Sequence, residues 1–251
     1  MYGVWFQLNC ATIVPRIIVL GSWFMNTIIS YHELVGIEKQ NLQRGMNYRC
    51  SVGHSVFLMS TRSNAPYDDQ IAADGRILIY EGHNCDKRHS KNPKEDDQPR
   101  FLASGKITEN GKFEKAALDF KNNKRAAEAV RVYEKIKDGI WSFNGVFKLV
   151  DSYQKQVDGR VVFKFILQLT DEKIQGLKEV IELEEDARVI PSDVKAQVYK
   201  RDKGQCVKCA SKEHLHFDHI LPYSKGGTSR DVRNIQLLCA RHNLQKSDKI
   251  I

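Results

Sequence analysis

Residues 206–246 read CVKCASKEHLHFDHILPYSKGGTSRDVRNIQLLCARHNLQK. The stretch holds two short pairs of potential metal ligands and five further polar residues: Cys206/Cys209, Cys239/His242, Asp218, His219, Asn234, Asn243 and Lys246. A packed core has no use for polar residues at this spacing. The pattern therefore indicates metal binding and proton transfer rather than packing.

The two short pairs predict a structural zinc site. Zn²⁺ in such sites takes four sulfur or nitrogen ligands in a tetrahedron, usually from two closely spaced pairs. Gly204 precedes the first pair and permits a tight turn, and the second pair shares one face of a helix predicted from residue 239 to about residue 249. The alternative is a set of unrelated buried cysteines. We expect Zn²⁺ on Cys206, Cys209, Cys239 and His242.

The segment between the pairs predicts a β-hairpin. Residues 214–220 alternate as a strand does, and Leu221-Pro222 ends the strand. Residues 234–239 form the returning strand, and a short helix is expected from Pro191-Ser192 to about Arg201, with Ser192 as its N-cap. Two strands and a helix around a metal make a ββα-metal unit.

The segment from about residue 190 to residue 249, a quarter of the chain, resembles the HNH endonuclease family. The resemblance rests on these motifs: Arg201-Asp202, Gly204, Cys206, Asp218-His219-Ile-Leu-Pro222, Gly226-Gly227, Asn234-Ile-Gln-Leu-Leu-Cys239 and Asn243-Leu-Gln-Lys246. His242 differs, because the family more often has a fourth zinc cysteine there. Imidazole is also a competent zinc ligand, so the zinc prediction is unchanged.

The resemblance implies a role for each inner residue. His219 is the expected general base, since imidazole titrates near neutral pH. Asp218 and Asn243 are expected to hold one catalytic Mg²⁺ or Mn²⁺ through oxygen ligands. Asn234 is expected to hydrogen-bond across the hairpin, and Lys246 to contact a phosphate. Neighbouring strand residues point to opposite faces, so Asp218 and His219 share a site only where the strand bends or ends.

Residues 31–170 are predicted to be a β-rich domain, a twisted sheet or barrel with one or two helices. Strands are expected at residues 55–59, 76–80, 146–153 and 161–169, and a helix at residues 112–121. Asp158-Gly159 is a strong hairpin-turn signal between the last two strands.

This domain resembles the SRA (YDG) fold, which binds modified cytosine in DNA. The resemblance lies in these motifs: Pro66-Tyr67-Asp68-Asp69, Asp74-Gly75, Ile79-Tyr80-Glu-Gly82, residues 130–133, residues 140–147 and the strand at 161–169. A flipped base needs flat side chains around it and an acceptor for its amine. The resemblance implies a sandwich of Tyr67 and Tyr80, an acceptor in Asp69 or Asp68, and duplex contact by Arg62. The alternative is half-buried sheet tyrosines beside a turn.

Length and charge favour two domains and a polyanionic partner. The chain has 251 residues and a net charge of +8. Residues 191–251 hold 12 Lys/Arg against 6 Asp/Glu, so +6 of that charge lies in the HNH-like segment. Double-stranded DNA is the expected partner. The remaining cysteines lack paired spacing and are expected to be reduced thiols of a cytoplasmic protein.

The boundaries expected from composition are an N-terminal extension at 1–30, the SRA-like domain at 31–170, an acidic helical linker at 171–190 and the HNH domain at 191–251. Residues 1–24 suggest a translated upstream region with Met25 as the natural start. A weak membrane anchor is the alternative, although the apolar run at 17–24 is too short to span a membrane.

The sequence thus predicts an α+β protein: an SRA-like sheet or barrel followed by a zinc-containing ββα-metal domain. Its expected function is cleavage of DNA containing 5-methylcytosine or 5-hydroxymethylcytosine, in defence against foreign DNA. One rival is an HNH endonuclease that reads unmodified sequence, and another is a non-catalytic zinc module that binds DNA. One HNH site cuts one strand at a time, so double-strand cleavage suggests a homodimer.

Overall fold

The computed structural model describes residues 25–51, 53–72, 75–88, 90–170, 189–222 and 225–246. Its strands are β1 (Thr27–Ser30), β2 (Met46–Asn47), β3 (Ser55–Met59), β4 (Gln70–Ile71), β5 (Ile77–Glu81), β6 (Glu128–Lys137), β7 (Ile140–Val157), β8 (Arg160–Leu169), β9 (Leu215–His219) and β10 (Ile235–Cys239). Its helices are α1 (Tyr31–Glu38), α2 (Glu109–Lys121), α3 (Ser192–Arg201) and α4 (Ala240–Lys246), with a 3₁₀ turn, η2 (Val232–Asn234).

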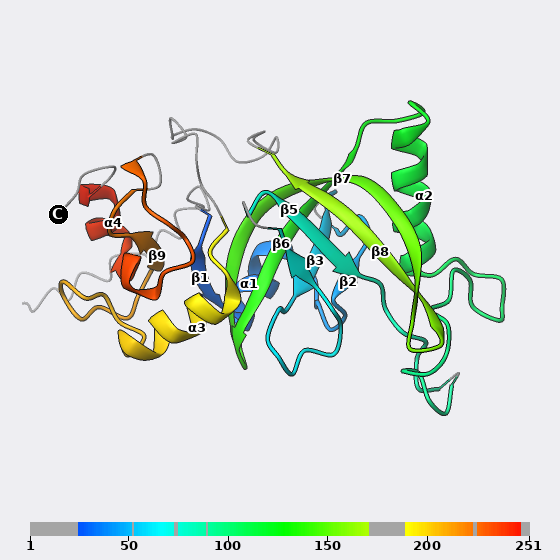
Figure 1. Cartoon of the computed structure of the whole chain (residues 1–251), viewed down its shortest axis with the longest axis horizontal. Helices are drawn as coiled ribbons and strands as arrows, with labels where there is room; N and C mark the ends of the chain where they lie inside the picture. The colour runs from blue at the N-terminus through cyan, green and yellow to red at the C-terminus, as the bar shows by residue number, and fades with distance from the viewer. Residues whose placement is uncertain are drawn as a thin grey trace, which may run out of the picture.

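These ten strands form one sheet, and the expected mixed α+β class is confirmed. The main path runs β10-β9-β1-β7-β6-β3-β2, while β8 pairs with β7, β5 with β8 and β4 with β5. β3 and β6 run parallel, and the other described pairs are antiparallel. Figure 1 shows the β9–α4 part at one end, α2 at the other, and β1 between β9 and the long front strands.

The front part of the sheet is built around the β7–β8 hairpin. Asp158 and Gly159 make its two-residue turn, both with positive φ, as the sequence predicts. Thr108 is the N-cap residue of α2, and its side chain accepts the Gly111 N–H; the helix packs against β7. The apolar core between α2 and the sheet is rich in aromatic rings, among them Phe113 of α2 and Phe57 of β3. β7 is longer than predicted at both ends, because it runs from residue 140 to residue 157 instead of from 146 to 153.

The predicted N-terminal extension at 1–30 is wrong in its last residues. Thr27 to Ser30 form β1, which pairs with β7 in a register that places Thr27 opposite Phe143. β1 also pairs with β9, where Thr27 lies opposite His216. Residues 1–24 lie outside the described part of the chain. The strand was missed because it is short and its partners lie far along the chain, where no local pattern reveals them.

The last two residues of the predicted linker at 171–190 pack into the apolar core. The helix predicted there falls on residues 171–188, which lie outside the described residues. Val189 and Ile190 are both buried, each in a different apolar cluster. α3 begins at Ser192 with Pro191 as its N-cap residue, so the prediction of Ser192 as N-cap is wrong. The Ser192 hydroxyl instead donates to buried Glu134 on β6.

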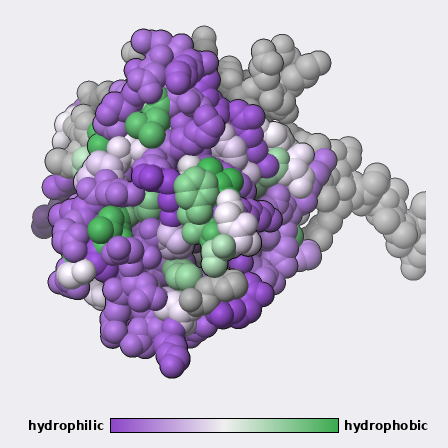
Figure 2. Space-filling view, turned by 90° about the vertical axis from the view of Figure 1, so that its right-hand side faces the viewer, coloured by the Kyte–Doolittle hydropathy of each residue, from purple (hydrophilic) through white to green (hydrophobic). Residues whose placement is uncertain are grey.

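The surface at the α2 end is mainly hydrophilic and carries a few separate apolar patches (Figure 2). Phe101, Leu118 and Tyr153 are exposed large apolar side chains of this front part. Isolated apolar side chains of this kind are ordinary on protein surfaces. Among the described residues, the helices are too short or too polar to cross a bilayer.

Candidate active site and metal centre

Four ligand atoms converge where the loop after α3 meets the start of α4. Cys206 Sγ and Cys239 Sγ each lie 3.4 Å from His242 Nδ1, and Cys209 Sγ lies 3.8 Å from Cys239 Sγ. The ligand atoms of all four residues lie within 4.8 Å of one another. In a tetrahedral site with Zn–S of about 2.3 Å and Zn–N of about 2.0–2.1 Å, ligand atoms are roughly 3.5–3.8 Å apart. The cluster therefore fits a zinc ion.

Local electrostatics favour a thiolate at Cys206. Burial opposes its ionisation, but the backbone N–H groups of Cys239 and Lys208 and the His242 side chain hydrogen-bond to its sulfur. Together they lower the pKa of the Cys206 thiol to about 6. A thiolate is the form that binds zinc, so the sulfur is prepared for the metal.

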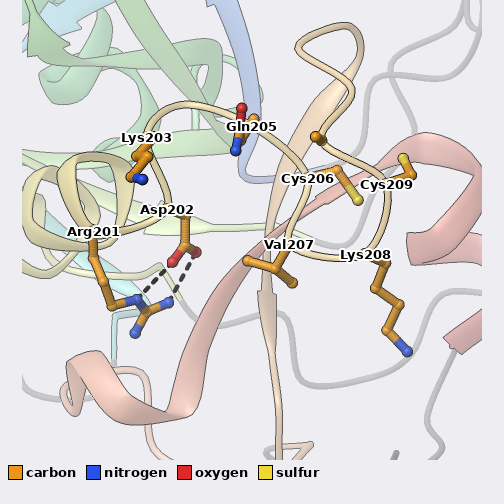
Figure 3. A pocket seen from close by; sticks show the side chains of 9 residues that line it. Arg201, Asp202, Lys203, Gln205, Cys206, Val207, Lys208 and Cys209 are labelled. Atoms are coloured by element: carbon orange, nitrogen blue, oxygen red, sulfur yellow. Dashed lines mark hydrogen bonds and ion pairs between the residues drawn. The ribbon is translucent and has the colours of Figure 1, made fainter.

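The loop that carries the first cysteine pair is fixed by its flanking residues. Gly204 has φ +60°, and a Cβ there would lie 2.8 Å from the end of the Tyr199 side chain, so the position favours glycine. Arg201 pairs with Asp202 through two hydrogen bonds of 2.6 and 2.9 Å, and Asp202 accepts the Leu237 N–H at 2.9 Å. Figure 3 shows this pair at the start of the loop and Cys206 and Cys209 further along it, around a shallow hollow.

Asp218 lies near the end of β9, directly opposite Gln236 of β10. Its carboxylate accepts a hydrogen bond of 3.0 Å from Gln236 Nε2, and Lys246 Nζ lies 3.2 Å from its Oδ2. Burial raises the pKa of Asp218, although Gln236 and Lys246 oppose that effect. The carboxylate oxygens of Asp218 are of the kind that a divalent metal ion binds, and in this structure they face the Lys246 ammonium.

His219 is the last residue of β9, and its side chain bonds to the loop rather than to α4. Its Nε2 lies 2.9 Å from the Ser229 hydroxyl oxygen. Burial, assisted by the positive charge of Lys246, lowers the pKa of His219 to about 4. The imidazole is therefore neutral at neutral pH, which is the form that accepts a proton.

Asn234 joins the two arms of the hairpin. Its Oδ1 accepts the Leu221 N–H at 2.8 Å, and its Nδ2 donates to the carbonyl oxygens of Leu221 and Thr228 at 3.1 and 3.0 Å. Gly227 permits this close packing, because a Cβ there would lie 1.9 Å from the Leu221 carbonyl oxygen. These contacts hold the residues that follow His219 against the loop.

α4 supplies the remaining two predicted residues. Asn243 is half-buried and lies three positions before Lys246, so both belong to the same side of the helix. The sequence predicts a phosphate contact for Lys246. In the structure, however, its side chain is 1% exposed and its Nζ donates to the His219 carbonyl oxygen at 2.6 Å, beside Asp218. It therefore cannot reach a phosphate from this position.

The predicted tyrosine sandwich is not formed. Tyr80 is 1% exposed, its ring stacks on Phe57 with centroids 4.1 Å apart, and its hydroxyl donates to the Leu58 carbonyl oxygen. Tyr67 is half-buried, and the His83 ring stacks on it at 4.9 Å. The assignment of Tyr80 to a base-stacking face is wrong for this structure, because that ring belongs to the core of the sheet.

The predicted acceptors are both engaged within the protein. Asp69 is buried and accepts the N–H groups of Ser60 and Glu81, at 3.1 and 3.0 Å. Burial raises the pKa of Asp69 to about 7 despite those bonds. The Asp68 carboxylate is 61% exposed and lies 3.0 Å from Lys164 Nζ. Asp68 is thus the one of the two with a side chain open to solvent.

Arg62, predicted to meet the duplex, is partly buried, and its Nε donates to the Ser60 hydroxyl at 3.2 Å. Nearby, a cleft separates the front part from the β9–β10 loop. The front part lines it with Thr61, Gln70 and Ile71, and the loop lines it with Gly226, Thr228 and Ser229. Thr61, the neighbour of Arg62 in the chain, therefore faces the loop whose Ser229 contacts His219.

Two residues of the site are not evident from the sequence motifs. Ser229, which contacts His219, lies in a loop without periodic pattern and carries no signal of its own. Gln236, which contacts Asp218, could have been found from cross-strand pairing, because the hairpin register places the two residues opposite each other.

Comparison with known proteins gives one family match and several structural likenesses. The solved SRA domain of SUVH5 in complex with methylated CHH DNA is 19% identical, with a TM-score of 0.41, over 61% of this chain and 90% of that chain. The same domain bound to fully hydroxymethylated CG DNA is 22% identical, with a TM-score of 0.40, over 64% and 92%. Arabidopsis thaliana SUVH6 in complex with SAM is 18% identical, with a TM-score of 0.36, over 60% and 26%.

No curated protein matches the chain. The family match lies in the part that contains the cysteine–histidine cluster, Asp218 and His219. Residues 206–249 match the model of the HNH endonuclease family.

Proposed function

We propose that this protein is a metal-dependent HNH endonuclease that cleaves DNA. The observation that carries the proposal is a neutral His219 that directly follows the mostly buried Asp218 at the end of β9, with Lys246 Nζ contacting both the Asp218 carboxylate and the His219 carbonyl oxygen, inside the segment that matches the HNH endonuclease family. A proton acceptor beside a carboxylate that can hold a metal is what phosphodiester hydrolysis requires.

In the proposed reaction, His219 accepts a proton from water while the water oxygen attacks phosphorus. The bond from phosphorus to the leaving sugar oxygen then breaks. The tautomer that donates Nε2–H to Ser229 leaves the Nδ1 lone pair free for this proton. Asn234 would keep His219 in place through the bonds that it makes across the hairpin.

Two kinds of metal site fit these residues. Cys206, Cys209, Cys239 and His242 would hold structural Zn²⁺, as their spacing fits a tetrahedron. Asp218 and Asn243 would hold Mg²⁺ or Mn²⁺, because both offer oxygen ligands from β9 and α4, two elements that pack together. When bound, this ion supplies positive charge to the phosphoryl and leaving oxygens.

The front part would select the DNA by reading 5-methylcytosine or 5-hydroxymethylcytosine, in restriction of foreign DNA. The support is the likeness of its sequence motifs to the SRA fold and the net charge of +8. Tyr67 and Asp68, both reachable from solvent, are the residues proposed to contact the base. Each chain offers one cutting site, so cleavage of both strands would need two copies.

A second candidate is an HNH endonuclease that reads unmodified sequence. The burial of Tyr80 and the stacking of His83 on Tyr67 favour it, because together they leave no open tyrosine sandwich for a flipped base. Both candidates require the same cutting site and differ only in how the DNA is chosen.

One digest separates the candidates. Supercoiled plasmid with and without cytosine methylation is incubated with zinc-loaded protein and Mg²⁺ or Mn²⁺, and nicked and linear products are counted. We expect cutting by the parent protein and a loss of about two to four orders of magnitude in His219→Ala, with DNA binding retained. Cutting of both plasmids at equal rates would select the unmodified-sequence reader. Undiminished cutting by His219→Ala would exclude this active site.

A further inference from the structure

Lys246 occupies an unusual place for a lysine. Its side chain is 1% exposed, and its Nζ lies 3.2 and 3.4 Å from the two carboxylate oxygens of Asp218 and 2.6 Å from the His219 carbonyl oxygen. Lysine is almost never buried unless it is paired. Here the pairing partner is the residue proposed as a metal ligand, so an internal cation lies at the proposed ion site.

This arrangement balances charge when no ion is bound. Asp218 is 12% exposed, and an isolated buried carboxylate is costly. The Lys246 ammonium neutralises it, and Gln236 supplies a further hydrogen bond at 3.0 Å. The pair has one negative and one positive charge, so it is stable without metal.

A divalent ion on Asp218 would break that balance. An ion at ordinary oxygen-ligand distances of about 2.0–2.6 Å would share the carboxylate with the ammonium. Two cations that close together, in a partly desolvated site, repel strongly. The ammonium must then move away, and it loses its only carboxylate among the described contacts of Lys246. A DNA phosphate supplies the negative charge that it needs.

We propose that Lys246 is a built-in competitor of the catalytic ion, displaced from Asp218 when ion and DNA bind together. The inference rests on the proposed function and adds that binding of the catalytic ion depends on bound DNA. The ion binds weakly to the protein alone and tightly to the protein–DNA complex, because a phosphate accepts the displaced ammonium. By linkage, the ion strengthens DNA binding by the same factor.

The test is a titration of the zinc-loaded full chain with Mn²⁺. The electron paramagnetic resonance signal of free Mn²⁺ measures how much of the ion is bound. His219→Ala serves as the parent because it keeps Asp218 and prevents cutting. Titrations are made with and without duplex DNA, and Asp218→Asn with the same DNA gives the Mn²⁺ held by DNA alone. We expect DNA to tighten Mn²⁺ binding about tenfold or more.

Lys246→Met in that background is the decisive variant. We expect it to bind Mn²⁺ about tenfold more tightly without DNA and to lose the effect of DNA. Lys208→Met is the matched control, since this exposed lysine acts on Asp218 only through its long-range charge. It should leave both affinities close to those of the parent. A merely structural role for Lys246 would weaken metal binding, not strengthen it.

The outcomes are distinct. Equal Mn²⁺ affinity with and without DNA overturns the inference, and this result is obtained with Lys246 intact, so it does not depend on the variant folding. Equal affinity of Lys246→Met and the parent in the absence of DNA overturns it as well. If the protein with native His219 cuts DNA in either case, the proposed function stands. Failure to bind Mn²⁺ under all conditions, together with absence of cutting, overturns both.

Discussion

Lys195 Nζ lies 2.8 Å from Glu134 Oε2, and both side chains are completely buried. Lys195 belongs to α3 and Glu134 to β6, so the ion pair joins the HNH-like part to the front sheet. Asn144 of β7 completes the network by accepting from Lys195 at 2.6 Å and donating to Glu134 at 3.0 Å. Burial lowers the pKa of Lys195 and the charge of Glu134 opposes this shift. The two parts of the protein are therefore held in a fixed relation.

Breaking this pair should destabilise the protein strongly. Lys195→Met leaves the Glu134 carboxylate without its cation, and loss of one partner of a buried pair costs about 3–5 kcal/mol. The double variant Lys195→Met, Glu134→Leu removes both charges and should lose less than the single variant. Urea unfolding measures both. Lys200→Met, an exposed site on the same helix, is the control. A single variant as stable as the parent would show that the pair contributes nothing.

Loss of a zinc ligand should unfold the HNH-like part. We expect Cys206→Ser or Cys239→Ser to lose the ion and the order of residues 202–246, because metal binding and folding are linked in small zinc units. Metal analysis should find about one zinc per parent chain. Limited proteolysis detects the unfolding, because an unfolded segment is cleaved faster than a folded one. Cys85→Ser, a half-buried cysteine outside the cluster, should behave like the parent. A zinc-free Cys206→Ser protein that resists protease would contradict this expectation.

Ser229 should tune the proposed base through its bond to His219. Ser229→Ala removes a hydrogen bond of about 0.5–1.5 kcal/mol, so the cutting rate should fall roughly two- to tenfold. Ser229→Thr keeps the hydroxyl and should restore the rate, which a purely steric role would not predict. Thr228→Ala, in the same loop, is the control. Single-turnover kinetics on plasmid distinguish these cases, and an undiminished rate in Ser229→Ala would remove Ser229 from the site.

His83 should make stability fall in mild acid. Burial, with a smaller contribution from Arg44, lowers the pKa of His83 to about 4 from 6.5. Between these pH values the unfolded chain binds a proton that the folded protein excludes, so the free energy of unfolding decreases as pH falls from 6.5 to 4. The shift corresponds to about 3 kcal/mol. His83→Gln should lose that share of the pH dependence, as judged by urea midpoints at pH 7 and 4.5. An unchanged slope would place His83 in a more open environment.

Local patterns anticipated the elements that local sequence determines. The alternation before Pro222 corresponds to β9, the Asp158-Gly159 turn closes β7 onto β8, and the cysteine spacing corresponds to the cluster with His242. Each depends on residues close in sequence or on a fixed ligand geometry. Periodicity and spacing are sufficient to predict such features.

Local patterns do not predict contacts between segments that are distant in the sequence. The burial of Tyr80 depends on Phe57 from β3, and the position of Lys246 depends on Asp218, which lies 28 residues earlier. A motif names the residue types of a site but does not say which of them neutralise one another. The ion pair between Lys246 and Asp218 is a tertiary property of that kind.

The position of β1 also sets an order of events during synthesis. Thr27 and His216 are opposite each other in the sheet but 189 positions apart in the chain. The ribosome therefore synthesises β1 early. The edge of β1 that pairs with β9 stays unpaired until β9 is made, after β6, β7 and β8. Pairings over such separations form late, because closing a long loop costs entropy. A prematurely ended chain would carry β1 without its β9 partner and Glu134 without Lys195, so the front sheet would lack contacts that only the C-terminal part supplies.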